Sequence, residues 1–380
     1  MSAVYYRFMR SRREQPFFEP PERGLPPMSS FKVLGAGPSG LTAALTLARA
    51  GHEVDVYERR HECGARFGGD LQALENWAGD ADVPEWLDGL GLEINFDCTP
   101  FRSIVETNGR TSACLEFDRP MFYIVRRGPE PGSLDQGLKA QALAEGVRVH
   151  FGETRPPGEV DIVATGPVVN ELFAVAKGIV FDTDHENLAA GFLNDRGAIK
   201  GYSYLVVVNH YACISSVLFD HFERAQRCFE EARDVLMGEH PMPMENVRSV
   251  GGVAHFSGAN RFMQLGVPHA GEAAGLQELL WGFGMQTAIE SGALASRSLI
   301  DGLDYQAEAR ARFGRRMSAS IVNRALWELL APSDYVGVIH GLKLNARATL
   351  RSLYRLNPLQ RLLHAPARAY VRRRYPDLEL

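Results

Sequence analysis

The sequence predicts an α/β fold in which a three-layer ββα nucleotide-binding domain is interrupted by an antiparallel β-sheet and followed by helices. Three observations predict it. A glycine-rich turn joins a strand to a helix at residues 31–50, short β-like runs fill residues 178–219, and helical patterns cover most of residues 286–365. Alternation of strand and helix is typical of a parallel sheet, whereas consecutive short strands indicate an antiparallel one.

Composition excludes several classes of protein. Of the 380 residues, 45% are hydrophobic and 23% are charged, an ordinary globular balance. The apolar run YLVVV at 204–208 is far shorter than the roughly 20 residues that cross a bilayer. The five cysteines are never spaced as CxxC, which argues against a disulfide framework or a zinc site. We therefore expect a cytoplasmic protein without a metal.

Residues 1–28 carry arginines and prolines but lack the apolar core of a secretory signal. The first predicted strand begins only after them, in the segment MSSFKVLGAG that starts at Met28. We expect residues 1–28 to be a flexible extension, and Met28 to be the natural start of the folded domain.

The first predicted unit is a Rossmann-like βαβ start. The strand FKVLGAG at 31–37 leads into a helix that ends near residue 50, and the strand EVDVYE follows at 53–58. Gly35, Gly37 and Gly40 form the pattern GxGxxG: the first permits a tight turn, the second lets the backbone approach a pyrophosphate, and the third packs helix on strand.

The residues around this turn define the nucleotide. Pro38 and Ser39 begin the helix, whose N-terminal N–H groups are free to bind phosphate. Glu58 closes the second strand, where an acid accepts hydrogen bonds from ribose hydroxyls. An acid at this position disfavours a 2′-phosphate and leaves FAD or NAD.

Further strands and helices are predicted along the rest of the chain. A strand at 148–153 precedes the apolar run EVDIVATGP at 159–167, which ends in a glycine turn. Among the β-like runs, two are separated by Asn209 and His210, a pair typical of a tight hairpin turn. Helices are predicted at 220–237, 286–302 and over most of 305–365, with breaks at Pro332 and Pro358.

A second glycine-rich turn, in GEAAGLQELLWGFGMQTAIESGALA at 271–295, favours FAD over NAD. Glu272 could accept a hydrogen bond from a ribityl hydroxyl. The turn of Gly282, Phe283, Gly284 and Met285 would direct backbone N–H groups at a flavin ring, and the helix that follows would stabilise negative charge on the reduced ring. Two turns would thus hold one long cofactor.

These motifs resemble the FAD-dependent oxidoreductases of the para-hydroxybenzoate hydroxylase fold, and within them the geranylgeranyl reductase-like branch. The resemblance covers residues 31–300 and rests on GAGPSG, YIVRRG, DIVATGP, GEAAG and WGFG. It implies the following cofactor-binding residues: Gly35, Gly37, Pro38, Ser39, Gly40, Glu58, Arg59, Arg66, Arg126, Gly166, Gly271, Glu272, Gly282, Phe283, Gly284 and Met285.

The resemblance also implies a division of the chain. Residues 29–100, 126–168 and 255–303 would form the FAD-binding domain, residues 101–125 and 169–254 the inserted antiparallel β-sheet substrate domain, and residues 304–380 a helical C-terminal region. Trp281, Tyr202 and Tyr204 are candidates for the substrate pocket, although packing explains them equally well. His210, His255 and His269 are candidate general acids but are more typical of loop or core histidines. No catalytic residue is assigned.

The implied reaction is hydride transfer from reduced flavin to a C=C bond of an apolar, isoprenoid or lipid-like, or polyunsaturated substrate. NAD(P)H or another donor would bind transiently, because no second GxGxxG is present. Two alternatives stay open, a flavin-dependent monooxygenase of an aromatic or lipid substrate and a non-redox flavin-dependent cyclase. The chain departs from the resemblance where Glu272 replaces an aspartate and where QELLWG lacks the usual proline.

The C-terminal region is basic in an otherwise acidic chain. Residues 340–380 hold nine Lys/Arg and two Asp/Glu, a local balance of +7 against −5 for the whole protein. Arg347, Arg351 and Arg355 recur every four residues and so share one helix face. That pattern is typical either of a solvated helix face or of peripheral contact with an anionic membrane. No nucleic-acid partner is expected, since no binding module accompanies the arginines.

Overall fold

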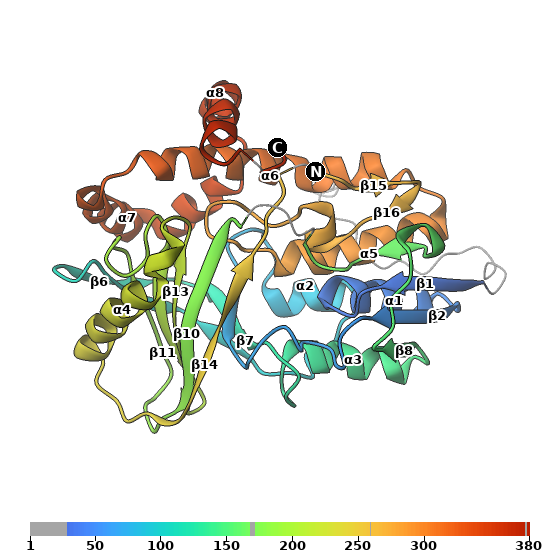
Figure 1. Cartoon of the computed structure of the whole chain (residues 1–380), viewed down its shortest axis with the longest axis horizontal. Helices are drawn as coiled ribbons and strands as arrows, with labels where there is room; N and C mark the ends of the chain where they lie inside the picture. The colour runs from blue at the N-terminus through green and yellow to red at the C-terminus, as the bar shows by residue number, and fades with distance from the viewer. Residues whose placement is uncertain (1–28, 168–171, 259, 377) are drawn as a thin grey trace, which may run out of the picture.

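The computed structural model describes residues 29–167, 172–258, 260–376 and 378–380. The predicted extension 1–28 and the predicted start at Met28 lie outside these residues. Figure 1 shows a parallel sheet of β1, β2 and β8 on one side, a larger sheet containing β10 and β14 on the other, and helices α5 to α8 across the top of both. The predicted α/β class with a second, antiparallel sheet and a helical end is confirmed.

The parallel sheet has the order β8-β2-β1-β9. Its strands are β1 (Ser30–Leu34), β2 (Glu53–Glu58), β8 (Arg148–Phe151) and β9 (Ile162–Val163). Helix α1 (Pro38–Arg49) crosses between β1 and β2 and packs against α3 (Leu134–Ala144) and α5 (Met285–Asp301). The predicted βαβ start is therefore present, with the glycine turn between β1 and α1.

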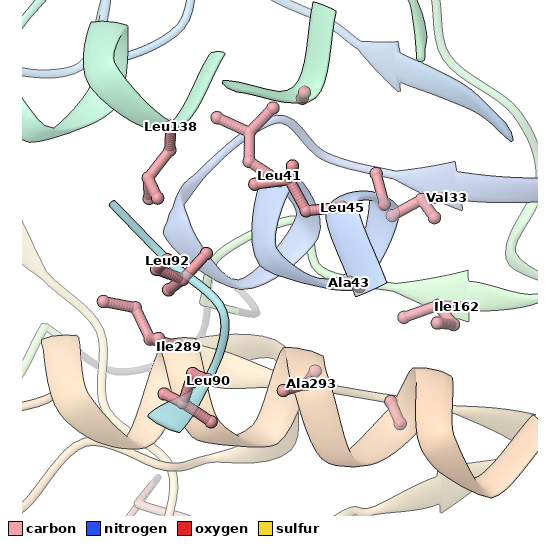
Figure 2. Packing of buried hydrophobic residues seen from close by; sticks show 14 of the residues in the cluster. Val33, Leu41, Ala43, Leu45, Leu90, Leu92, Leu138, Ile162, Ile289 and Ala293 are labelled. Atoms are coloured by element: carbon pink, nitrogen blue, oxygen red, sulfur yellow. The ribbon is translucent and has the colours of Figure 1, made fainter. Parts of the chain in front are cut away.

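A three-stranded antiparallel sheet lies on the other side of these helices. It has the order β3-β7-β4, formed by β3 (Leu71–Glu75), β4 (Cys98–Phe101) and β7 (Phe122–Arg126), and α2 (Val83–Gly89) lies between β3 and β4 in sequence. One buried apolar cluster combines side chains of both sheets with those of the helices between them, including Val33 from β1, Leu74 from β3 and Leu41 from α1. Figure 2 shows Leu41 of α1 near Leu138 of α3, and Ile289 near Leu90 and Leu92.

The larger sheet has seven strands in the order β14-β10-β13-β12-β11-β5-β6, antiparallel except where β11 pairs with β5. The strands are β5 (Ser103–Thr107), β6 (Ser112–Glu116), β10 (Ala174–Asp182), β11 (Leu188–Phe192), β12 (Tyr202–Val208), β13 (Tyr211–Leu218) and β14 (Glu245–Ala254). Asn209 and His210 join β12 to β13 with φ of 48° and 65°, as a two-residue hairpin turn requires. Helix α4 (Ala225–Glu239) packs on one face of this sheet.

The structure divides residues 101–125, which were predicted to lie in one domain, between two sheets. Strands β5 and β6 join the seven-stranded sheet. Strand β7 pairs instead with β3 and β4, so the chain crosses between the two sheets at residues 102 and 117–121. A short β15 (Met263–Gln264) and β16 (Val267–Pro268) lead back to the nucleotide-binding part.

The C-terminal region is helical, as predicted. Helix α6 (Tyr305–Leu329) ends before Pro332, α7 (Tyr335–Leu353) follows, and α8 (Pro358–Arg374) begins at Pro358. Both prolines stand at helix starts, where the missing N–H costs nothing. Arg324 of α6 is fully buried and bonds Glu328 of the same helix and the carbonyls of Leu280 and Lys200, which ties α6 to the loop before α5 and to the loop before β12. Within the described residues, no helix is long and apolar enough to cross a membrane.

Candidate cofactor and substrate site

The three glycines of the first turn have different surroundings. Gly35 has φ of +104°, and a Cβ there would meet the carbonyl oxygen of Ala164. A Cβ on Gly40 would meet the carbonyl oxygen of Gly35. Gly37 differs, because nothing lies within 4 Å of the position that its Cβ would take. Two of the glycines thus let backbone segments approach, and the third leaves open space at the start of α1.

The N-terminus of α1 offers polar groups to that space. Its N-cap is Gly37 and it has no side-chain cap, so the first N–H groups are available to an anion. Ser39 is 5% exposed, and its Oγ has no hydrogen-bond partner among the described residues. Glu58 lies beside the turn, where its carboxylate accepts from the N–H of Ala36 (2.9 Å) and of Arg60 (2.8 Å). These groups fit a pyrophosphate and a ribose; Arg59 next to Glu58 is exposed.

Three segments that are far apart in the sequence converge beside this turn. Gly271 packs against Ser39, with 3.1 Å between its Cβ position and the Ser39 Cβ. Arg66 forms an ion pair with Glu272, Nη1 to Oε2 2.7 Å. Gly166 opens onto that pair, since its Cβ position lies 3.6 Å from Glu272 Oε2. The structure therefore brings together the predicted Gly166, Gly271, Glu272 and Arg66, and adds the ion pair.

Arg126 and its neighbour Arg127 point to opposite sides of β7, as successive strand residues do. The Arg126 guanidinium lies 4.0 Å from the ring centre of Tyr211, on the side of the seven-stranded sheet. Arg127 is buried, pairs with Asp135 at 2.9 Å and lies 4.2 Å from the ring centre of Phe67. Arg127 is thus the arginine of YIVRRG that contacts the segment around Arg66, a role that the motif alone does not assign.

The second turn is organised by an acid that the sequence did not single out. Glu278 is 1% exposed and accepts from the N–H groups of Leu280 (2.8 Å), Trp281 (2.6 Å) and Phe283 (3.3 Å). Burial raises the pKa of its carboxyl. Helix α5 then begins at Met285, with Gly284 as its N-cap and no side-chain cap. An acid in the otherwise apolar run QELLWG is the signal that would have indicated it.

An aromatic wall adjoins this turn. Trp77 packs edge-on against Phe283, with ring centres 5.5 Å apart, and Trp281 packs on Phe283 at 6.3 Å. Tyr202 donates from its hydroxyl to the carbonyl of Trp281 (2.8 Å), and Tyr204 donates to the carbonyl of Leu71 (3.2 Å). The predicted pocket residues Trp281, Tyr202 and Tyr204 therefore lie together, and Trp77, which the sequence analysis missed, joins them.

Two of the candidate histidines, His210 and His269, lie in a turn and in the core. His210 occupies the hairpin turn between β12 and β13 and is exposed. His269 is buried beside the parallel sheet, with Nδ1 3.0 Å from the carbonyl oxygen of Val267. Burial lowers the pKa of His269, so its ring is neutral at pH 7. Neither of these two adjoins the aromatic wall.

Comparison with known proteins finds likenesses to parts of this chain. Residues 33–69 match the family described as the NAD(P)-binding Rossmann-like domain. The zeta-carotene desaturase of Synechocystis is 28% identical over 175 residues, 43% of this chain and 33% of that protein. The kynurenine 3-monooxygenase of Salinispora tropica is 30% identical over 175 residues, 42% of this chain and 38% of that protein. The chain therefore spans less than two fifths of these relatives.

Solved structures extend the likeness over most of the chain. A geranylgeranyl bacteriochlorophyll reductase-like protein from Thermoplasma acidophilum superposes with a TM-score of 0.65 at 15% identity, covering 83% of this chain and 92% of that one. A flavin-dependent brominase superposes with a TM-score of 0.64 at 13% identity, covering 90% and 100%. The chain thus has the fold of this group of flavoproteins, with an N-terminal dinucleotide-binding turn.

Proposed function

We propose that the protein binds FAD and reduces a C=C bond of an apolar, isoprenoid-like substrate by hydride transfer. The observation that carries the proposal is the aromatic wall of Trp77, Trp281, Phe283 and Tyr204 beside the turn that starts α5. Apolar and aromatic surface of this kind accommodates a hydrocarbon better than a charged metabolite. The fold shared with a reductase-like protein also supports reduction as the reaction.

Several groups of the chain would hold FAD. The start of α1 and Ser39 would bind the pyrophosphate, Glu58 the adenosine ribose, and the Arg66–Glu272 pair a ribityl hydroxyl. The uncapped start of α5 would favour negative charge on a reduced ring, whereas the N–H groups of Leu280, Trp281 and Phe283 are already bonded to Glu278. FAD, when bound, supplies the hydride. NAD(P)H or another donor would reduce it in a transient encounter.

Anaerobic turnover tests the reaction. Dithionite-reduced protein is mixed with geranylgeraniol without oxygen, and the product is analysed by mass spectrometry. We expect a mass gain of one H2 for each bond reduced, because reduction consumes the hydride and one proton. Turnover that occurs only with oxygen and adds an oxygen atom would instead establish a monooxygenase. Ring closure without a mass change would establish a cyclase.

We also propose that the helical end docks on an anionic membrane surface. Four leucines of α6, α7 and α8 are largely exposed: Leu329 (68%), Leu344 (87%), Leu359 (63%) and Leu362 (76%). Arg355 and Arg361 are exposed near the start of α8. By contrast, Arg347 and Arg351 face Asp118 (3.7 Å) and Asp80 (2.6 Å), so the evenly spaced arginine face is partly neutralised.

Liposome co-sedimentation tests the docking. We expect binding to anionic vesicles at low salt, loss at high salt, and a roughly 30-fold or greater weakening for Arg355→Glu/Arg361→Glu, since each of the two basic residues contributes about 1 kcal/mol near the surface. Arg372 and Arg374 are avoided, because they bond the Leu380 carbonyl and Asp220. Equal sedimentation with neutral and anionic vesicles would reject the electrostatic contact.

A further inference from the structure

Glu106 of β5 is a carboxyl group in an apolar place. Its carboxylate lies over Gly191 of β11, so close that both oxygens would collide with any Cβ on that residue. Register confirms the position: Glu106 pairs with Gly191, and Gly191 pairs with Tyr204 of β12. Residues paired across neighbouring strands share a face of the sheet. Glu106 and Tyr204 therefore flank Gly191 on one face.

That face is the one that meets the aromatic wall. Ala113, the partner of Glu106 on β6, belongs to the apolar cluster that contains Tyr204, Trp281 and Phe283. Ile104, two residues before Glu106 on the same face, belongs to it as well. The stack of Tyr202 on Tyr204, with ring centres 6.3 Å apart, continues the wall toward Trp281.

Among the described residues, Glu106 lacks the kind of compensating group that two other buried acids have. Glu75 pairs with Arg316, and Glu278 accepts from three backbone N–H groups. Glu106 keeps some accessible surface as a residue, but its Oε2 is buried and has no hydrogen-bond partner among the described residues. Burial raises the pKa of Glu106 to about 8, and no charged neighbour contributes to this shift in the described part of the chain.

A buried acid without a hydrogen-bond partner lowers the stability of the folded protein. Leaving a polar group unpaired in the interior costs about 1–3 kcal/mol. A glycine on the neighbouring strand that makes room for the carboxyl, at the edge of an aromatic wall, places a neutral O–H donor where a hydrocarbon would lie. Neutral carboxylic acids in apolar sites serve as proton donors at neutral pH.

We propose that Glu106 is the proton donor of the reduction, a role that rests on the proposed function. The carboxyl proton of Glu106 forms a C–H bond at one alkene carbon as the C=C π bond breaks; FAD, when bound and reduced, would supply the hydride for the other carbon. The carboxylate left on Glu106 takes a proton from solvent. One H2 equivalent is added, the alkene is reduced, and the flavin is oxidised.

Infrared spectroscopy tests the acid itself in flavin-free protein. At pH 7 the wild type should show the C=O stretch of a protonated carboxyl, and Glu106→Gln should lose it. Glu239→Gln is the matched control, because Glu239 is exposed and bonds the hydroxyl of Thr107 on the same strand (2.8 Å); it should keep the band. A spectrum that Glu106→Gln leaves unchanged overturns the proposal.

Single turnover of reduced holoprotein with geranylgeraniol tests the proton transfer. Glu106→Gln should bind FAD normally and reduce the alkene roughly a hundredfold or more slowly, the usual contribution of a general acid. Gly191→Ala should be slowed likewise with Glu106 retained, since the added methyl displaces the carboxyl. Equal rates in Glu106→Gln and wild type would overturn proton donation by Glu106 and leave the proposed reduction standing. Failure of the wild type to reduce any C=C bond overturns the proposed function with it, whereas the infrared band still reports the acid.

Discussion

Replacing Gly37 by valine should give a folded protein that binds FAD more weakly, whereas Gly40→Val should destabilise the fold itself. Gly37 has φ of −82° and ψ of −179°, a conformation open to any residue, and its Cβ position is free of neighbours. An isopropyl group there would fill the space at the start of α1 that a pyrophosphate requires. The substitution thus separates cofactor binding from folding.

Gly40 has the opposite surroundings. A Cβ there would collide with the carbonyl oxygen of Gly35, and backbone atoms cannot turn away as a side chain can. Overpacking of a core usually costs about 1–3 kcal/mol, occasionally more, and a clash with backbone belongs at the upper end. Gly40 also lies in the interior of the βαβ unit, so relief would separate α1 from β1.

Two measurements decide this pair. The absorbance ratio of flavin to protein reports FAD, which Gly37→Val should bind at least about tenfold more weakly, a loss of ~1.4 kcal/mol or more. Far-ultraviolet circular dichroism and thermal unfolding report the fold, which flavin-free wild type and Gly37→Val should share. Full FAD retention by Gly37→Val would show that the pyrophosphate does not lie at this turn.

Local signals predicted the parts of this molecule that depend on local chemistry. The spacing of Gly35, Gly37 and Gly40 predicted the first turn, because tight turning and close approach require glycine at those positions. Asn209 and His210 predicted the β12–β13 hairpin, because its turn requires two residues with positive φ. Pro332 and Pro358 predicted breaks in the helical region, because proline lacks the N–H that a helix interior requires, and the structure places both at helix starts.

Features that depend on distant partners were not predictable in this way. Glu106 is unusual only because Gly191 leaves room for it, and nothing in the sequence pairs β5 with β11. Arg126 and Arg127 are adjacent, and only the pairing of β7 shows which of them faces Phe67. Helical spacing placed Arg347 and Arg351 on α7, but the helix ends at Leu353, so the predicted third member of that face, Arg355, lies beyond it. Nor did the spacing show that Asp80 would neutralise Arg351.

The stability of wild type relative to Glu106→Gln should fall as pH rises from about 5 to about 8. The pKa of Glu106 is about 8 in the folded protein, against an ordinary value of 4.5. Below the ordinary value, the carboxyl is protonated in both the folded and the unfolded chain. As pH rises above it, the unfolded chain loses the proton first and is stabilised by ionisation, while the folded protein holds the proton until pH exceeds the raised pKa.

The size of the effect follows from linkage between protonation and folding. Within this window the folded state binds one more proton than the unfolded state, so the free energy of unfolding falls by ~1.4 kcal/mol per pH unit. Glutamine has nearly the same shape and no proton to lose, so Glu106→Gln should lack this slope. The difference between the two proteins should change by roughly 3 kcal/mol between pH 5 and pH 7.

Urea denaturation at pH 5, 6, 7 and 8 measures this difference, since the midpoint and slope give the free energy of unfolding. Every other titrating group is common to the two proteins and cancels in the comparison. Glu239→Gln, which removes an exposed acid near the same strand, should follow wild type across the range. Parallel curves for wild type and Glu106→Gln would mean that the carboxyl is ionised in the fold, because only a proton retained by Glu106 gives the two proteins different slopes.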